Sequence, residues 1–211
     1  MTTLEENQQL KILLGSADSL SLVVAPNAAA DGLYAALALK EVFVSQGKLA
    51  TVVYPSSLPP TLQNLPEAKE IKENLAESSL VISLDTVNQP IGKVSYFMEG
   101  SLFNLVIGPV SHNFEVANIK PILRAQKIDL IVTLGALQLE DLGKVYSQNQ
   151  EELTKNAILN IDNHNENTHF GTLDVIDPLA KSLCEMIFYK LAQWEMRPNT
   201  AAAKWLTLGF S

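Results

Sequence analysis

The chain alternates short runs of apolar, β-branched residues with longer stretches that have the periodicity of helices. The apolar runs have the length of buried strands, and the stretches between them carry apolar residues on one helical face. Strands are expected at 19–26, 48–55 and 79–86, and helices at 4–14, 27–47 and 65–76, with Asn27 as the cap of the second helix. This strand–helix–strand rhythm predicts a parallel sheet that is covered by helices on both faces.

The rhythm changes in the middle of the chain. Residues 93–108, KVSYFMEGSLFNLVIG, form two extended runs around Glu99 and Gly100, which predicts a β-hairpin. After a linking segment at 119–125, strands are expected at 128–134 and 157–162, and helices at 139–147, 179–194 and 200–208. We therefore predict an α/β fold with a mainly parallel, five-stranded, Rossmann-like sheet, helices on both faces and an inserted β-hairpin. Residues 1–190 are interpreted as one domain, and residues 191–211 as a helical connector towards a further C-terminal domain.

Charge and cysteine content narrow the classes of function. The 211 residues carry a net charge of −8 with a pI of about 4.9, and Arg124 and Arg197 are the only arginines. Because non-specific nucleic-acid binders present a basic surface, broad binding of nucleic acids is not expected. Cys184 is the only cysteine, the N-terminal segment is polar and acidic, and no apolar run reaches the roughly 18 residues of a membrane span. The sequence therefore predicts a cytoplasmic protein without a membrane contact.

One loop carries a resemblance to a known family. Ligands of parallel sheets bind beyond the carboxyl ends of the strands, and the loop after the strand at 157–162 includes the polar segment NHNENTH. Residues 160–191 resemble the third motif of the DHH-family phosphoesterases, in the branch of the oligoribonucleases and pAp phosphatases. The matching positions are Asn160, Ile161, Asp162, His164, Asn167, Phe170, Gly171, Asp177, Pro178 and Glu185. Residues 23–40 and 128–146 resemble further motifs, so the resemblance extends over about residues 18–208.

The resemblance implies a site for two divalent metals, usually manganese, which polarise a phosphate and activate a water. It places ligand positions of the family on Ala25, Ala29, Asp31, Gly135 and Asn163. Only Asp31 keeps the family's ligand, and the last ligand of the family belongs to a segment that would follow Ser211. His164 corresponds to a second histidine, which faces the substrate phosphate in the family. Because a hard dication needs several carboxylates or imidazoles, we predict a dismantled site and expect no metal cofactor.

The five degenerate positions are expected to cluster around one cleft. Asn27 and His164 are the candidates for a weak phosphate contact, since Asn27 precedes a helix whose N-terminus attracts anions. Asp31 has a second interpretation, as an acidic residue that the dipole favours in the first turn of a helix. Trp194 and Trp205 are interpreted as docking residues for a further part of the protein.

Different classes of function fit these features. The first is a non-catalytic module, a pseudoenzyme on the DHH fold, which binds another protein and binds a nucleotide weakly. The alternative is a phosphoesterase that uses Mn²⁺ or Mg²⁺ to hydrolyse short oligonucleotides or pAp-like nucleotides. That enzyme would need an unusual ligand set, such as Asp31, Asp85, Asp162 and His164. A third hypothesis is a self-associating structural subunit. The expected partner is thus a protein or a second copy of the chain.

Overall fold

The computed structural model describes residues 3–75, 78–84, 92–108, 119–125 and 127–210. The chain divides into two compact units. The first unit comprises residues 1–76 and 127–211, and the second comprises residues 77–126. The second unit is thus inserted between two parts of the first along the sequence.

The first unit is built on a five-stranded sheet in which every neighbouring pair is parallel. Its strands are β1 (Ser19–Val24), β2 (Leu49–Val53), β7 (Leu130–Leu134), β8 (Ala157–Asp162) and β9 (Leu173–Ile176), in the order β2-β1-β7-β8-β9. The predicted α/β fold with a five-stranded parallel sheet is therefore confirmed. The fifth strand, β9, was not predicted, because its four residues are too few to show a pattern.

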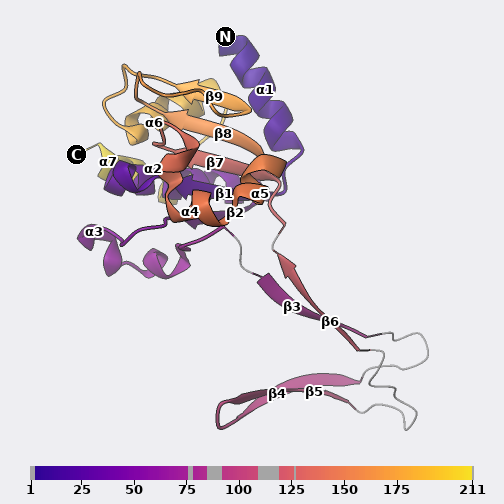
Figure 1. Cartoon of the computed structure of the whole chain (residues 1–211). Helices are drawn as coiled ribbons and strands as arrows, with labels where there is room; N and C mark the ends of the chain where they lie inside the picture. Colours follow the sequence, from indigo (N-terminus) through magenta and orange to yellow (C-terminus); the bar gives the residue numbers. More distant parts are fainter. Residues whose placement is uncertain (1–2, 76–77, 85–91, 109–118, 126, 211) are drawn as a thin grey trace. The chain divides into compact units, whose positions relative to one another are not determined.

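Helices cover both faces of this sheet (Figure 1). One face packs against α1 (Thr3–Gly15), α2 (Ala29–Ser45), α6 (Leu183–Gln193) and α7 (Thr200–Gly209), and the other against η4 (Leu139–Leu142), α4 (Lys144–Gln148) and α5 (Gln150–Lys155). The pleat of β1 explains the division, because Leu22 and Val24 contribute to the first core while Val23 contributes to the second. A strand with both faces buried reads as a continuous apolar run, which is what the sequence contains.

One predicted element of the first half of the chain is wrong, and another is present but lies in a different sheet from the one expected. The helix expected at 65–76 is replaced by two short turns, α3 (Pro60–Gln63) and the 3₁₀ helix η2 (Pro66–Glu70), each with a proline at its start. The strand expected at 79–86 is β3 (Ser78–Ser83), which lies in the second unit and not in the parallel sheet. It pairs antiparallel with β6 (Lys120–Ala125), so the predicted linking segment is itself a strand.

The second unit contains the predicted hairpin. Strands β4 (Lys93–Glu99) and β5 (Leu102–Gly108) pair antiparallel around a turn at Gly100, whose φ of 61° suits a glycine. Among the described residues, β4 and β5 form a two-stranded sheet of their own. The inserted hairpin is therefore confirmed.

The C-terminal helices are both present, and the first of them is shorter than expected. Helix α6 begins at Leu183 and not at Leu179, because the Ser182 side chain accepts the N–H of Glu185 and caps the helix there. Trp194 and Trp205 are 3% and 2% exposed, so neither is available for docking. The prediction that residues 191–211 lead to a further domain stays a prediction, although α7 packs against α2 and α6 within the first unit. None of the described helices is both long and apolar enough to span a bilayer.

Candidate functional site

Three of the ligand positions that the resemblance implies lie at the carboxyl ends of adjacent strands. The N–H of Ala25, after β1, donates to the carbonyl oxygen of Leu134 at 3.0 Å, and the N–H of Gly135, after β7, donates to that of Ile161 at 2.9 Å. Asn163 follows β8 directly. The sheet therefore brings Ala25, Gly135 and Asn163 to one edge, where parallel sheets bind ligands.

The space beside Gly135 is filled by apolar side chains. A Cβ atom at Gly135, whose φ is +71°, would lie 2.4 Å from the Cβ of Ala28 and 3.2 Å from a methyl group of Leu183. A Cβ atom at Gly32 in α2 would lie 2.6 Å from the same Ala28 atom. Ala28 and Leu183 thus occupy the region between the start of α2, the end of β7 and the start of α6. A side chain at position 135, where the family has a carboxylate, meets both steric overlap and an unfavourable backbone conformation.

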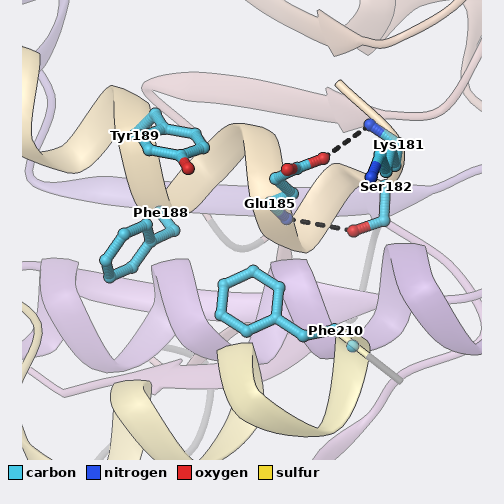
Figure 2. Close-up of a pocket in the computed structure, with 7 residues that line it drawn as sticks. Lys181, Ser182, Glu185, Phe188, Tyr189 and Phe210 are labelled. Atoms are coloured by element: carbon cyan, nitrogen blue, oxygen red, sulfur yellow. Dashed lines mark hydrogen bonds between the residues drawn. The ribbon is translucent and has the colours of Figure 1, made fainter. Parts of the chain in front are cut away.

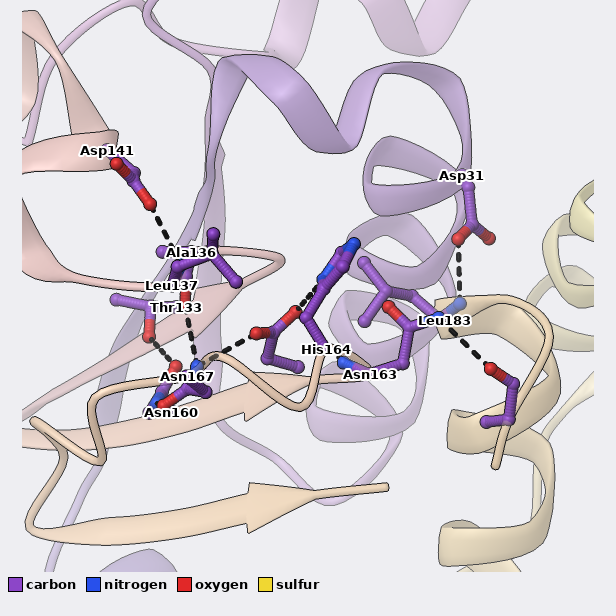
Figure 3. Close-up of polar contacts among 12 residues, drawn as sticks. Asp31, Thr133, Ala136, Leu137, Asp141, Asn160, Asn163, His164, Asn167 and Leu183 are labelled. Carbon is purple, nitrogen blue, oxygen red and sulfur yellow. Dashed lines mark hydrogen bonds and ion pairs between the residues drawn. The ribbon is translucent and has the colours of Figure 1, made fainter. Parts of the chain in front are cut away.

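Asp31, at the one implied ligand position that carries a carboxylate, contacts the start of another helix. It lies in the first turn of α2, and its two carboxylate oxygens accept the N–H groups of Leu183 at 2.7 Å and Cys184 at 3.1 Å (Figure 3). Both N–H groups belong to the first turn of α6, where they have no acceptor within the helix itself. The helix dipole also favours a negative charge at this end. Both oxygens of Asp31 are therefore engaged in joining α2 to α6.

A different arrangement surrounds Asp162 at the end of β8. Its carboxylate is fully buried and accepts the N–H of Asn163 at 2.9 Å and the side-chain amide of Asn167 at 2.8 Å. The Nδ1 atom of His164 lies 2.8 Å from the same carboxylate, and the imidazole is 51% exposed (Figure 3). Asn163 also donates from its side chain to the carbonyl oxygen of Ala180 at 3.1 Å. The side-chain amide of Asn163 thus holds the loop to the segment before α6.

A second layer of amides lies beneath this loop. Asn160, fully buried in β8, accepts the Thr133 hydroxyl at 3.1 Å and donates to both Asn167 and Asp174 at 2.9 Å. Gly171 donates its N–H to Asp174 at 3.0 Å. Asn160, Asn167 and Gly171 are positions of the third motif, and their contacts fix the shape of the loop. Asp174 was not singled out from the sequence, since an aspartate inside a short unpredicted strand gave no signal.

The other candidate residues that the structure describes, Asn27 and Ala29, lie at or just before the start of α2. Asn27 is exposed and sits inside the 3₁₀ turn η1 (Pro26–Ala28), so it does not cap α2, whose N-cap is Ala28 without a side-chain bond. Ala29 is exposed, with a φ of 46°. Asp85 lies outside the described residues. Within the described parts of the chain, no three His, Cys, Asp or Glu side chains are grouped so that they could hold a metal ion.

Cys184 is buried behind Asp31, as its apolar helical face predicts. Burial raises the pKa of the thiol, and the Asp31 charge and a hydrogen bond with Asp31 raise that pKa further. The Sγ atom lies 3.6 Å from the backbone oxygen of Asp31. A thiol in this setting stays protonated and packs as a small apolar side chain.

A pocket of about 540 Å³ opens where the start of α6 meets the end of α7 (Figure 2). It is lined by Lys181, Ser182, Glu185, Phe188, Tyr189, Gly209 and Phe210. The ring of Phe188 packs edge-on against the rings of Tyr189 and Phe210, with centroids 5.4 and 5.7 Å apart. The first N–H groups of α6 are already used, because Leu183 and Cys184 donate to Asp31. Those of Glu185 and Met186 donate to the hydroxyl and the carbonyl oxygen of Ser182. The helix end therefore offers the pocket no unpaired amide for an anion.

Comparison with known proteins adds a fold relationship. No family model and no curated protein matches the sequence. Among solved structures, the chain is similar to an exopolyphosphatase-related protein from Bacteroides fragilis, with a TM-score of 0.64 and 14% sequence identity. The match covers 98% of this chain and 49% of that protein, so the chain spans about half the length of the neighbour. The chain therefore shares the α/β, Rossmann-like fold of that structure.

Proposed function

We propose that this chain is a non-catalytic, protein-binding module on the fold of the DHH phosphoesterases, related to the oligoribonuclease and pAp-phosphatase branch, whose metal site has been dismantled. One observation carries the proposal. Asp31, which occupies the one retained ligand position, engages both carboxylate oxygens with the first turn of α6, at 2.7 and 3.1 Å. A carboxylate that caps a helix in this way has a structural use that needs no metal.

The residues present do not fit a pair of divalent metals. Mn²⁺ and Mg²⁺ prefer several hard oxygen or imidazole ligands, and the implied ligand set contains two alanines, a glycine and an asparagine. The neighbours of Gly135 support the same view, because Ala28 and Leu183 fill the volume that a carboxylate there would need. Asp31 and Asp162 are each bonded to backbone N–H groups instead.

Nucleotide binding at this edge is proposed to be weak. The N–H groups of the N-cap and of the first residue of α2 are used within η1, since Ala28 donates to Ala25 and Ala29 donates to Pro26. The exposed imidazole of His164 is the main remaining donor, and the chain carries a net charge of −8. Such contacts contribute about 1–3 kcal/mol, which corresponds to millimolar affinity at best.

Exposed apolar side chains support a protein contact. Phe188, Tyr189 and Phe210 form one group on the first unit and are 47%, 58% and 50% exposed. The hairpin of the second unit carries a larger group of exposed apolar side chains. Contiguous exposed apolar surface is typical of a binding surface.

The proposal is tested by measuring manganese after purification in manganese-containing buffer, together with calorimetric titration of Mn²⁺ and of pAp. We expect no stoichiometric manganese, no shift of the melting temperature with Mn²⁺, and no micromolar binding of pAp. The Asp31→Ala variant is the matched control, because it removes the one retained ligand. Near-stoichiometric manganese that is lost in this variant would contradict the proposal.

The contact between Asp162 and His164, 2.8 Å long, favours the alternative of a phosphoesterase. A buried carboxylate that orients an exposed imidazole is a common arrangement for proton transfer. Under this alternative, the chain hydrolyses pAp or a dinucleotide in the presence of Mn²⁺, and His164→Ala removes the activity. Absence of turnover by the wild-type chain with Mn²⁺ or Mg²⁺ would leave the non-catalytic module as the supported function.

A further inference from the structure

The β4–β5 hairpin has one face that is entirely apolar. The register pairs Val94 with Ile107, Tyr96 with Leu105, and Met98 with Phe103, and side chains alternate between the two faces of a strand. These six side chains therefore share one face, which we call the apolar hairpin face. The opposite face mixes both kinds of residue: Lys93, Ser95, Phe97, Glu99, Leu102, Asn104 and Val106, with Gly108 completing the register.

This apolar hairpin face is exposed. Tyr96, Met98 and Phe103 are 71%, 61% and 63% exposed, and the rings of Tyr96 and Phe103 stack with centroids 5.4 Å apart. An isolated two-stranded hairpin is only marginally stable in water and normally needs a second layer against its apolar side. The apolar composition of the face therefore indicates that another apolar surface covers it.

We propose that the apolar hairpin face is a self-association surface, covered by the same face of a second copy of this chain. Charge supports a second copy as the occupant. Lys93 and Glu99 are the only charged residues of the hairpin, they cancel, and both lie on the opposite face. In a chain with a net charge of −8, the hairpin is thus a neutral surface where two copies meet without burying or opposing a charge.

The available area supports the same arrangement. From the exposed fractions and the typical areas of such side chains, the face offers about 500 Å² per copy. Two copies packed face to face would bury about 1,000 Å² in total, which is the lower end for a specific interface. A two-fold axis through the middle of the face would give a self-complementary contact, with the two sheets about 10 Å apart.

This inference rests on the proposed protein-binding role and names the partner. It does not rest on the loss of the metal site, so the two can fail separately. Sedimentation analysis of the full chain over a range of concentrations measures self-association. The manganese and pAp measurements decide the non-catalytic role independently.

Two phenylalanines on opposite faces of the hairpin provide a matched pair of variants. Phe103→Glu places a charge on the apolar hairpin face, and Phe97→Glu places the same charge on the other face, at a residue that is 49% exposed. We expect the wild type to dimerise reversibly, Phe103→Glu to weaken the dimer about 100-fold or more, and Phe97→Glu to change it by less than about threefold. A chain that stays monomeric at every concentration, or equal effects of the two variants, would overturn the proposal.

Cross-linking keeps the proposal testable where Phe103→Glu only unfolds the hairpin. Cys184 is buried and is the only cysteine, so a cysteine introduced on the hairpin is the reactive one. Leu105 lies at the centre of the apolar hairpin face, and Phe97 lies on the opposite face. We expect Leu105→Cys to form an intermolecular disulfide under mild oxidation much faster than Phe97→Cys. Equal rates for the two variants, or faster cross-linking at position 97, would overturn the face-to-face arrangement.

Discussion

The loops at the carboxyl edge of the parallel sheet fall into two groups that are built differently. After β1 and β7, the positions that the resemblance matches to metal ligands are alanine and glycine, and Ala28 and Leu183 fill the space beside Gly135. After β8, the loop carries polar residues, which form a hydrogen-bonded network around the buried Asp162. The difference teaches that neighbouring loops at one edge of a sheet can be fixed in two ways, by apolar packing after β7 and by buried polar contacts after β8.

The largest expected effect tests whether the loop after β7 has room for a carboxylate at position 135. In Gly135→Asp, a side chain overlaps Ala28 and forces an unfavourable φ, so we expect a loss of about 4 kcal/mol or more in the free energy of unfolding. Denaturant unfolding measures this loss. Gly47→Asp is the control, because Gly47 also has a positive φ of 82° but has open space around it. It should cost about 1–2 kcal/mol.

Similar costs for these two variants would mean that backbone conformation alone explains the loss at position 135. The edge after β7 would then have room for a carboxylate, and the contrast between the two groups of loops would be weaker. A gain of Mn²⁺ binding by Gly135→Asp would remove the contrast altogether.

The second prediction concerns the polar group of loops. Asp162→Ala removes the acceptor of the Asn163 N–H and of the Asn167 amide from a buried position, so we expect a loss of about 3 kcal/mol in the free energy of unfolding. Asn165→Ala, at an exposed position of the same loop, is the control and should change stability by less than about 0.5 kcal/mol. A near-neutral Asp162→Ala would show that the network is dispensable and that Asp162 is retained for chemistry.

Much of the fold could be predicted because the central strands of the first unit are buried on both faces. The apolar runs of β1, β7 and β8 are nearly continuous, and β2 was located from a similar run although its first residues are exposed. The wrong sheet for β3 has a different cause from the local misses at 65–76 and at β9, which is that the deciding contacts are distant in sequence. Strand β3 is apolar in the same way as the others, yet it pairs with β6, about 40 residues further along the chain.

The sequence predicted where the candidate site residues lie along the chain better than it predicted which residues they contact. The order of residues along the motifs placed Ala25, Gly135 and Asn163 after their strands, where the structure also has them. The link between Asp31 and the start of α6 spans 152 residues and has no local signature. The start of α6 itself could have been found, because Ser182 and Glu185 have the spacing of a helix cap.

The third prediction measures the link that Asp31 makes between α2 and the start of α6. Asp31→Ala leaves the N–H groups of Leu183 and Cys184 without their acceptor, so we expect a loss of about 1–2 kcal/mol. Asp31→Asn keeps one acceptor oxygen and should lose about half as much. Thermal unfolding with and without Mn²⁺ checks both variants. A metal ligand would behave oppositely, with Asp31→Ala neutral in the absence of Mn²⁺ and destabilising only in its presence.

The smallest effect on stability is expected for a substitution at the opposite end of the sheet, at Asp129. This substitution leaves both groups of loops intact, so it gives the baseline against which the other stability changes are compared. Asp129 pairs with Lys127 at 2.7 Å and accepts the N–H groups of Asp18 and Ser19 at 3.1 and 3.0 Å. The hydrogen bond from Lys127 lowers the pKa of Asp129, and the two N–H groups lower it further. A pKa that is lowered in the folded state stabilises the fold above the unfolded-state value of about 4, and this contribution disappears as the pH falls through the folded-state pKa.

The melting temperatures of the wild type and Asp129→Asn should therefore differ slightly at neutral pH and converge in acid. A difference that persists unchanged below the folded-state pKa would show that the asparagine acts through packing, and that the carboxylate charge has no part in holding β1 to the start of β7.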